Sequence, residues 1–572
     1  MRCPFDSLGW RFVLAVASSL LVSGCSLDRH AWHPAPLVSP IDFAAEQIPP
    51  TGLSLAEWHY TQARTLEEAD QAACVDHYYQ AAAQAWPAIR DMPPSAAATR
   101  SWGLYHSAVA QMLSAAQRHG RWKSQVGLMV QGPAGLAPVP AIYHDFAWNP
   151  GDFDHLAPVG SYEVPDLDHQ FRSTGVGVPL VVVRRAPPVE PFMQDTQSFA
   201  ATAVLRPSSG DSALSPTAFS QPSCFVLEFL NPLTSDALPS ATGNIPLARD
   251  LSAPFAYPPR GKDRAWLIDF LLPGSATKDD GLFMLEPYQP GKIPLVLVHG
   301  LLSDPLTWTN MVNELRSNRQ LCDRYQVWGF RYSTGTQFLG SAALLRQQLG
   351  EIRNVYDPQR ADPALSRMVL VGHSMGGLLA KLQVVYSGDE LWHTFANRPP
   401  SEIVTTPDVR GRLIEQLCFD PNPDIARVVF IGTPHQGSED ATRCIGRIGA
   451  SLAETSAAAK QAHAQLLRDN PGVFNAVFDR RIPNSIDMLE PANPFLLATL
   501  RLPFRAGVRF HSICGVMDRP LSSQPSDGVV SLTSARLIGA CSEKLVPAKH
   551  TKLTRDCTSI AEVTRILCQH SR

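Results

Sequence analysis

Residues 369–382 read VLVGHSMGGLLAKL, and this stretch decides the fold of the C-terminal half of the chain. Apolar residues run directly into the motif Gly-His-Ser-Met-Gly, and apolar residues with helical spacing follow at once. This order predicts a buried strand, a tight turn and a helix, with Ser374 at the tip of the turn. Gly372 and Gly376 leave room for such a turn. Small residues are common in turns, so the motif gains its weight from the strand and helix around it.

Strand-like and helix-like segments alternate on both sides of this motif, from about residue 280 onward. The segments that read as buried strands are KIPLVLVHG (292–300), YQVWGFRYST (325–334), IARVVFIGTPHQG (425–437) and VRFHSICGV (508–516). FLGSAALLRQQLGEIRNVY (338–356) has helical spacing. Nearly continuous apolar strands that alternate with helices indicate a parallel sheet covered on both faces. We therefore expect residues 276–572 to form one α/β domain.

A serine hydroxyl is a weak nucleophile unless a base takes its proton and an acidic side chain orients that base. Where a serine occupies this kind of turn, the chain order is serine, then aspartate or glutamate, then histidine. Asp527, in SDGVVS, and His550, in PAKHTKL, follow Ser374 in this order. Asp518, in VMDRP, is a second candidate for the acid because it also follows a strand-like segment.

Four other histidines lie near these segments. His435, in GTPHQG, precedes both candidate acids, so it breaks the chain order and we expect it to shape the pocket wall. His299 and His373 flank the motifs at buried turns, where we expect a structural role. His511 falls within a strand pattern and is expected to pack in the interior.

Four pieces of the sequence together resemble the bacterial lipase and esterase branch of the α/β-hydrolases. They are VLVHGLLSDPLTW (296–308), VLVGHSMGG (369–377), VFIGTPHQGS (429–438) and SDGVVS (526–531), the last followed by His550. The resemblance spans residues 294 to about 567. It implies an α/β-hydrolase fold and a catalytic triad of Ser374, Asp527 and His550.

The resemblance also implies an oxyanion hole made of two backbone N–H groups. One belongs to Met375, directly after the serine, and the other to Leu301, which follows Gly300 in the loop after the first strand. Some relatives carry a structural calcium, with an aspartate two residues after the histidine. Lys552 occupies that place here, so we predict no metal, and we expect no cofactor.

The segment between GTPHQGS and the next strand is long for a connection. Residues 437–500 contain an Ala-rich helical stretch, IGRIGASLAETSAAAKQAHAQLLRD, and then NSIDMLEPANPFLLATL. An insertion of this length at this point predicts a cap or lid over the pocket, and ordinary packing helices are the alternative.

The N-terminal half has a different composition and a different pattern of apolar residues. Residues 51–134 are rich in alanine and spaced aromatic residues, which predicts a helical hairpin region. The hairpin resembles tetratricopeptide-like pairs, which suggests a protein partner, and the alternative is a plain hairpin packed on the next domain. Residues 135–275 contain strand-like runs separated by Pro/Ser-rich connections and predict a β-rich accessory domain.

The first 24 residues read as a targeting signal, in which Arg2 and Arg11 precede a short apolar run that is followed by VSGC. Small residues before Cys25 resemble a bacterial lipoprotein signal, in which the cysteine is acylated and becomes the new N-terminus. An ordinary secretory signal is the alternative. Residues 25–50 are Pro-rich and predict an extended tether. Ser26 after the cysteine favours, by resemblance, an outer-membrane anchor that faces the periplasm.

Charge and cysteine content narrow the remaining classes. The formal charge of −3, without a basic run, speaks against nucleic acid as a partner. Nine cysteines remain after Cys3 and Cys25 are set aside from the total of 11. Their number is odd, and an oxidising compartment permits disulfides. Cys514 with Cys541 and Cys557 with Cys568 are the nearer pairs.

The sequence therefore predicts a membrane-anchored serine hydrolase that cleaves acyl esters through an acyl-enzyme. A non-catalytic envelope scaffold and an acyltransferase that uses the same triad are the two alternatives.

Overall fold

The computed structural model describes most of the chain. The described residues are 53–91, 96–160, 167–185, 190–194, 196–208, 224–240, 243–256, 280–334, 338–439, 457–480, 485, 487–517 and 524–572. The predicted signal, Cys25 and the predicted tether lie outside them, and so does Asp518. Within these residues, no helix combines the length and apolar character needed to cross a membrane.

The C-terminal half is built on a seven-stranded sheet. Its strands, in their order across the sheet, are β12 (Gly281–Met284), β14 (Tyr325–Arg331), β13 (Ile293–Val298), β15 (Met368–His373), β16 (Ile425–Ile431), β17 (Arg509–Gly515) and β18 (Ser542–Val546). The edge strand β12 pairs antiparallel with β14, and the other pairs in this sheet are parallel. The α/β-hydrolase fold class expected from the sequence is confirmed.

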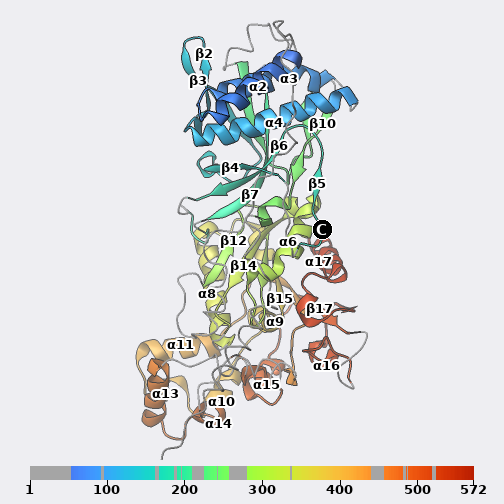
Figure 1. The fold of residues 1–572 in the computed structure, drawn as a ribbon. Helices are drawn as coiled ribbons and strands as arrows, with labels where there is room; N and C mark the ends of the chain where they lie inside the picture. Colours follow the sequence, from blue (N-terminus) through green and yellow to red (C-terminus); the bar gives the residue numbers. More distant parts are fainter. Residues whose placement is uncertain are drawn as a thin grey trace, which may run out of the picture.

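Helices cover both faces of this sheet (Figure 1). They are α6 (Thr309–Ser317), α7 (Arg319–Arg324), α8 (Phe338–Tyr356), α9 (Met375–Lys381), α16 (Leu532–Ala535) and α17 (Cys557–His570), with the short 3₁₀ turns η5 (Pro305–Trp308), η6 (Pro363–Arg367) and η9 (His550–Lys552). Helices α8 and α9 share an apolar core with one face, and α6 and α17 share another core with the opposite face. Every residue of β13 and β15 is buried, as expected for strands covered on both sides.

The N-terminal half places helices on a second seven-stranded sheet. Its strands, in order, are β1 (Trp122–Lys123), β2 (Gly127–Gly132), β3 (Gly135–His144), β8 (Phe225–Leu230), β7 (Gln197–Pro207), β6 (Val178–Arg184) and β4 (His155–Pro158). Two short ribbons pair β9 (Ala237–Ser240) with β10 (Gly243–Pro246) and β5 (Arg172–Ser173) with β11 (Arg249–Asp250), and the 3₁₀ turns are η1 (Pro150–Asp152) and η4 (Ala253–Ala256). The β-rich region expected from the sequence is confirmed, although its first strands begin before residue 135.

Three helices lie on this sheet, where the sequence suggested a hairpin of two. They are α2 (Leu53–Glu68), α3 (Cys74–Asp91) and α4 (Ala96–Arg118). The break between α2 and α3 falls where Asp70 takes a φ of 51°, among Ala, Glu and Gln residues that favour helix and so hide the turn in the sequence. Tyr105 of α4 donates its hydroxyl to the carbonyl of Leu205 in β7 and accepts from the N–H of the same residue, both at 2.9 Å. Helices and sheet share one core, which matches the plain packed arrangement.

A cap lies at the end of the C-terminal sheet where β15 runs into α9 (Figure 1). It contains α10 (Glu390–Phe395), α11 (Pro407–Leu417), α13 (Ala457–Asp469), α14 (Ala476–Arg480) and α15 (Pro494–Arg501), with η7 (Pro400–Glu402) and η8 (Asp487–Leu489). The cap is therefore made from two insertions, one before β16 and one after it. They are joined where Asn475 donates its N–H to the carbonyl of Phe395 (3.0 Å) and Asn397 donates to Val473 (3.0 Å).

The two halves of the chain are joined through α6. The N–H of Asp168 donates to Oδ1 of Asn310 (2.8 Å), and the hydroxyl of Ser252 donates to Oδ1 of Asn313 (2.8 Å). The amide of Asn313 in turn donates to the carbonyl of His169 (2.9 Å). Polar side chains of α6 thus fasten the hydrolase domain to loops of the accessory domain.

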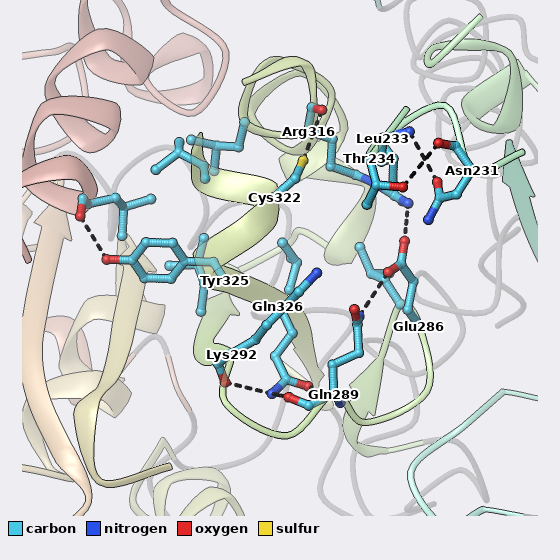
Figure 2. Close-up of a pocket in the computed structure, with 16 residues that line it drawn as sticks. Asn231, Leu233, Thr234, Glu286, Gln289, Lys292, Arg316, Cys322, Tyr325 and Gln326 are labelled. Atoms are coloured by element: carbon cyan, nitrogen blue, oxygen red, sulfur yellow. Dashed lines mark hydrogen bonds and ion pairs between the residues drawn. The ribbon is translucent and has the colours of Figure 1, made fainter. Parts of the chain in front are cut away.

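A small hollow lies at this junction, beside the residues where β13 and β14 begin (Figure 2). Arg316 and Glu286 form an ion pair there, and the thiol of Cys322 donates to the carbonyl of Arg316. Its volume of about 40 Å³ holds little more than one water molecule. It is too small for an ester substrate, and it lies at the opposite end of the strands from Ser374.

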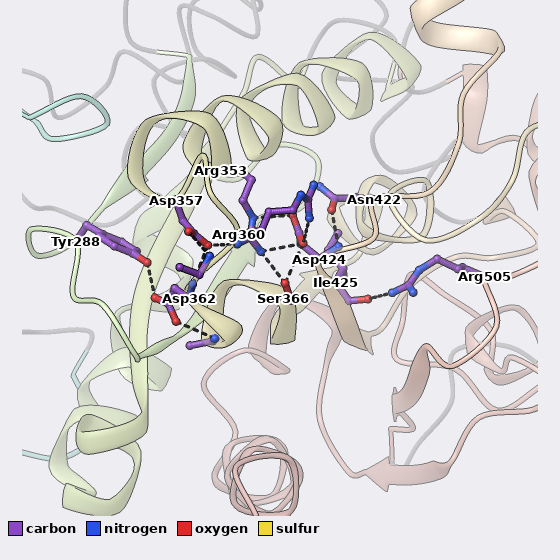
Figure 3. A network of polar contacts seen from close by, with 12 residues as sticks. Tyr288, Arg353, Asp357, Arg360, Asp362, Ser366, Asn422, Asp424, Ile425 and Arg505 are labelled. Atoms are coloured by element: carbon purple, nitrogen blue, oxygen red, sulfur yellow. Dashed lines mark hydrogen bonds and ion pairs between the residues drawn. The ribbon is translucent and has the colours of Figure 1, made fainter.

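A buried network of charged side chains lies at the end of the sheet where β16 begins (Figure 3). Arg353 of α8 makes two hydrogen bonds to Asp424, just before β16, with Nη2 to Oδ1 at 2.8 Å and Nε to Oδ2 at 3.1 Å. It also pairs with Asp357 and donates to Ser366 (2.8 Å). Arg353, Asp357 and Asp424 are all buried, so each charge depends on its partners.

Replacing Arg353 with methionine should therefore lower the free energy of unfolding by about 2–4 kcal/mol, because two buried carboxylates lose an ionic partner, while Asp424 keeps Arg360 (3.2 Å) and Asp357 keeps two backbone N–H donors. Denaturant unfolding of the purified variant measures this. Arg565→Met, which removes an exposed i,i+3 pair with Glu562, is the matched control and should cost less than about 1 kcal/mol. An equal decrease in the free energy of unfolding of the two variants would contradict the structural role of the network.

Candidate active site

Ser374 occupies a strained turn between β15 and α9. Its φ of 53° and ψ of −127° lie outside the regions that residues with a side chain normally adopt. The neighbouring glycines explain how the turn fits. A Cβ on Gly372 would lie 2.5 Å from the carbonyl oxygen of Gly376, and a Cβ on Gly376 would lie 2.2 Å from that of His299. Helix α9 therefore begins in direct contact with the residue that follows β13, and only glycine fits at positions 372 and 376.

The structure brings the three residues of the predicted triad together. The Oγ of Ser374 lies 2.9 Å from Nε2 of His550, and Nδ1 of His550 lies 2.7 Å from Oδ2 of Asp527. Asp527 comes from the loop after β17, and His550 opens η9 after β18. Ser374 and His550 are 8% and 7% exposed, and Asp527 is 2% exposed. All three residues are therefore buried, and Asp527 is the most enclosed of them.

Backbone hydrogen bonds hold Asp527 in this orientation. Its Oδ1 accepts from the N–H groups of Val529 (3.0 Å) and Val530 (2.7 Å), which leaves Oδ2 for the imidazole of His550. The N–H of His550 also donates to the carbonyl of Asp527 (3.0 Å). The sequence did not identify the two valine N–H groups, although Ser-Asp-Gly is a common signal for a turn of this kind.

The other candidate histidines surround the triad without joining it. Nε2 of His373 donates to the carbonyl of His550 (3.1 Å), and burial and the neighbouring His550 lower the pKa of His373 to about 3. His299 stacks on Tyr332 with ring centres 4.4 Å apart, and burial lowers its pKa to about 4. Both rings are therefore neutral at pH 7 and act as packing and hydrogen-bonding groups.

His435 and His511 also lie in the interior. The ring of His435 packs edge-on against Phe430, with centres 4.8 Å apart, and is 1% exposed. Its backbone N–H donates to the carbonyls of Thr433 and Ser534 (3.0 Å each). Nη1 of Arg427 donates to Nε2 of His511 (2.6 Å) on the opposite face of the sheet.

The loop after β13 passes directly beside the serine. A Cβ on Gly300 would lie 2.9 Å from the Cβ of Ser374, so the segment that leads to Leu301 lies against Ser374. Met375 is the first residue of α9, and the first N–H groups of a helix have no carbonyl partner within it. Both residues therefore lie next to Ser374 along the chain or in space.

Gly377 is a further constrained position that the sequence did not identify. A Cβ there would lie 1.9 Å from Oγ1 of Thr433, which follows β16. Helix α9 is thus in close contact with the ends of both neighbouring strands, β13 and β16. The sequence signal for this close packing was the presence of three glycines within residues 372–377.

The comparisons with known proteins agree with this architecture. Residues 295–550 match the family model described as "Alpha/beta hydrolase family". The strand order and the Ser374 turn lie within this match, so the C-terminal half is an α/β-hydrolase domain. No curated protein sequence matches the chain.

Three solved structures illustrate the structural similarity, and none of them supports a statement about substrate. The mature lipase BlEst2 of Bacillus licheniformis is 17% identical, with 50% of this chain and 97% of that chain covered and a TM-score of 0.30. Lipase 1 of Pelosinus fermentans is 15% identical, with 50% and 99% covered and a TM-score of 0.31. Esterase B of Lactobacillus rhamnosis is 15% identical, with 51% and 80% covered and a TM-score of 0.28.

Cys514 and Cys541 form no disulfide, and neither do Cys557 and Cys568. The nearer pairs suggested by the sequence are therefore not disulfides in this structure. Cys514 is buried in its strand, where its thiol donates to the carbonyl of Ala535.

The position of Asp527 predicts that Asp527→Asn will lower kcat by about 10⁴, because an amide does not hold the required tautomer of the imidazole. Asp518→Asn is the matched control and should retain most of the rate. Steady-state kinetics of both variants on one soluble ester decide the assignment. A larger loss in Asp518→Asn would transfer the role of the acid to that residue.

Proposed function

We propose that this protein is a serine hydrolase that cleaves carboxylic esters through an acyl-enzyme. One observation carries the proposal: a serine in a strained strand-to-helix turn lies 2.9 Å from the imidazole of His550, which is itself 2.7 Å from Asp527. Nucleophile, base and orienting acid are recognised by this geometry and not by their positions in the sequence.

In the proposed reaction, Oγ of Ser374 attacks the ester carbonyl carbon while Nε2 of His550 takes the hydroxyl proton. The carbonyl oxygen becomes an oxyanion, which accepts hydrogen bonds from the N–H groups of Leu301 and Met375. Collapse of this intermediate expels the alcohol, which takes its proton from His550. Water, deprotonated by His550, then attacks the acyl-enzyme and releases the carboxylic acid.

Apolar groups in the cap favour an ester with a hydrocarbon acyl chain. The side chains that face each other between α8 and the cap helices are mostly apolar, although the hollow they line, of about 30 Å³, is itself too small for a substrate: Leu339, Phe395, Leu413, Gln416, Leu417, Phe478, Met488 and Phe495. On this basis we propose acylglycerols or phospholipid acyl esters as the substrate class. Leu306, in η5 just after the loop that carries Leu301, is 66% exposed and adds an apolar group on the surface.

Ser374→Ala should lower kcat by about 10⁶ while the fold is kept, because the nucleophile is lost and the small side chain fits the turn. Hydrolysis of a chain-length series of chromogenic esters measures the loss, and circular dichroism checks the fold. A fluorophosphonate probe should label the wild type and leave the variant unlabelled. Retention of more than a few per cent of the rate would refute Ser374 as nucleophile.

The same assay separates the hydrolase from its alternatives. If a primary alcohol added to the assay captures most of the acyl group in preference to water, the protein is an acyltransferase. If the wild type neither hydrolyses any ester nor reacts with the probe, the domain is a non-catalytic scaffold.

We further propose that a lipid on Cys25 anchors the protein to the outer membrane, facing the periplasm. The support comes from the sequence, in which a short apolar run ends at VSGC and a Pro-rich segment follows. Each buried lipid CH₂ contributes about 0.8 kcal/mol, so several acyl chains on one cysteine hold a protein firmly.

Cys25→Ser should move the protein from the membrane fraction to the soluble periplasmic fraction, with little change in hydrolysis of a soluble ester. Cells carrying wild type or variant are labelled with a radioactive fatty acid and fractionated. The lipid anchor is wrong if the wild type takes no label, or if the unlabelled variant still sediments with membranes.

A further inference from the structure

Four buried polar side chains beneath α9 lack the partners that such groups normally have. Lys381, Thr433, His435 and Ser512 are each at most 1% exposed. Oγ1 of Thr433, Oγ of Ser512 and both ring nitrogens of His435 have no hydrogen-bond partner, and Lys381 pairs with no described acidic residue. Buried polar groups are satisfied in the large majority of cases, so three unsatisfied residues beside a buried lysine without an acidic partner point to a bound species.

Lys381 and Thr433 both lie at the face of α9 that carries Gly377. Thr433 contacts α9 at Gly377, where an added Cβ would lie 1.9 Å from its hydroxyl oxygen. Lys381 lies four residues after Gly377, and residues four apart share one face of a helix. His435 lies two residues after Thr433, and burial and the charge of Lys381 hold its pKa well below the ordinary value.

A series of aromatic contacts links Lys381 to His435. Nζ of Lys381 lies 5.8 Å from the ring centre of Phe504, which stacks on Phe510 at 4.4 Å. Phe510 lies 6.3 Å from Phe430, and Phe430 packs against the ring of His435 at 4.8 Å. The side chains in this series between Lys381 and His435 are apolar rings, and none of them carries a negative charge that could pair with the lysine.

Ser512 belongs to the same cluster by its position in the sheet. It pairs with Phe430 in the register of β16 and β17. It also lies two residues from Phe510 on β17, so both side chains project from the face covered by α9. Its unpartnered hydroxyl therefore lies on the same face of the sheet as Phe430 and Phe510.

The chemistry of the four groups favours an anion. An ammonium, two hydroxyls and a neutral imidazole can all donate hydrogen bonds. Burial lowers the pKa of Lys381 to about 8, so the ammonium is still mostly charged at pH 7. A buried charge without a partner is costly, and a small anion would supply both the charge and the acceptor.

We propose that Lys381, together with Thr433, His435 and Ser512, binds a small monovalent anion, chloride or a short carboxylate, between α9 and the strands β16 and β17. The bound anion joins the helix that begins at Ser374 to the loop that follows β16. It therefore stabilises the turn that holds the nucleophile, and its binding is independent of whether the triad hydrolyses esters.

Bromide is the direct probe, because it replaces chloride and scatters anomalously. Crystals of the wild-type protein soaked in bromide should show an anomalous peak in contact with Nζ of Lys381. Crystals of Lys381→Met should lack it. A site that holds only water, with no anomalous peak in the wild type, overturns the proposal.

Thermal unfolding tests the same site in solution. For the wild type, chloride, bromide or acetate at about five times its Kd should raise Tm by about 1–2 °C above the value in gluconate of equal ionic strength. The rise should vanish in Lys381→Met and persist in Lys544→Met, whose lysine is exposed. A comparison of chloride with acetate tells which anion the site prefers.

An equal rise in the wild type and in Lys381→Met would be a general salt effect and would refute the site. If Lys381→Met does not fold, Ser512→Ala serves in its place and should weaken the anion response several-fold. The bromide experiment on the wild type does not depend on either variant.

Discussion

The contact between the first turn of α9 and the end of β13 is the constraint on which the proposed site depends. A Cβ on Gly376 would approach the carbonyl oxygen of His299 to 2.2 Å, so the helix can begin this close to the sheet only with glycine there. Ser374 must then reverse the chain within one residue, which places it at a φ of 53°. The strain is offset by the packing of α9 between β13 and β16, and it leaves the hydroxyl pointing away from the strands.

The remaining members of the triad are positioned by short hydrogen-bonded links between loops. The backbone of His550 donates to Asp527 (3.0 Å) and accepts from the ring of His373 (3.1 Å), so His550 is attached both to Asp527 and to the residue before Ser374. His373 and His299 are kept neutral by burial. Positive charge would therefore develop on His550 alone among these three rings, where Asp527 is placed to stabilise it.

The rest of the molecule is added around this domain without entering the triad. The cap is assembled from two insertions that meet at Phe395 and Asn475, at the end of the sheet where the serine lies. The accessory half is fastened to α6 through Asn310 and Asn313, and its Asp168 also pairs with Arg555, five residues after His550.

The sequence by itself determined the order of strands and helices in the C-terminal half, the Ser374 turn and the two downstream partners. Apolar periodicity and the glycine spacing are local signals, and they need no knowledge of distant residues. Only the tertiary structure decided that Asp527 contacts His550, that residues 176 positions apart bring Ser374 and His550 together, and that two separate insertions form one cap. The clearest case is Lys381: no local pattern marks this lysine as buried, yet it is 1% exposed, with Nζ 5.8 Å from the ring centre of the distant residue Phe504. Such burial depends on contacts between segments far apart in the chain, which no local pattern records.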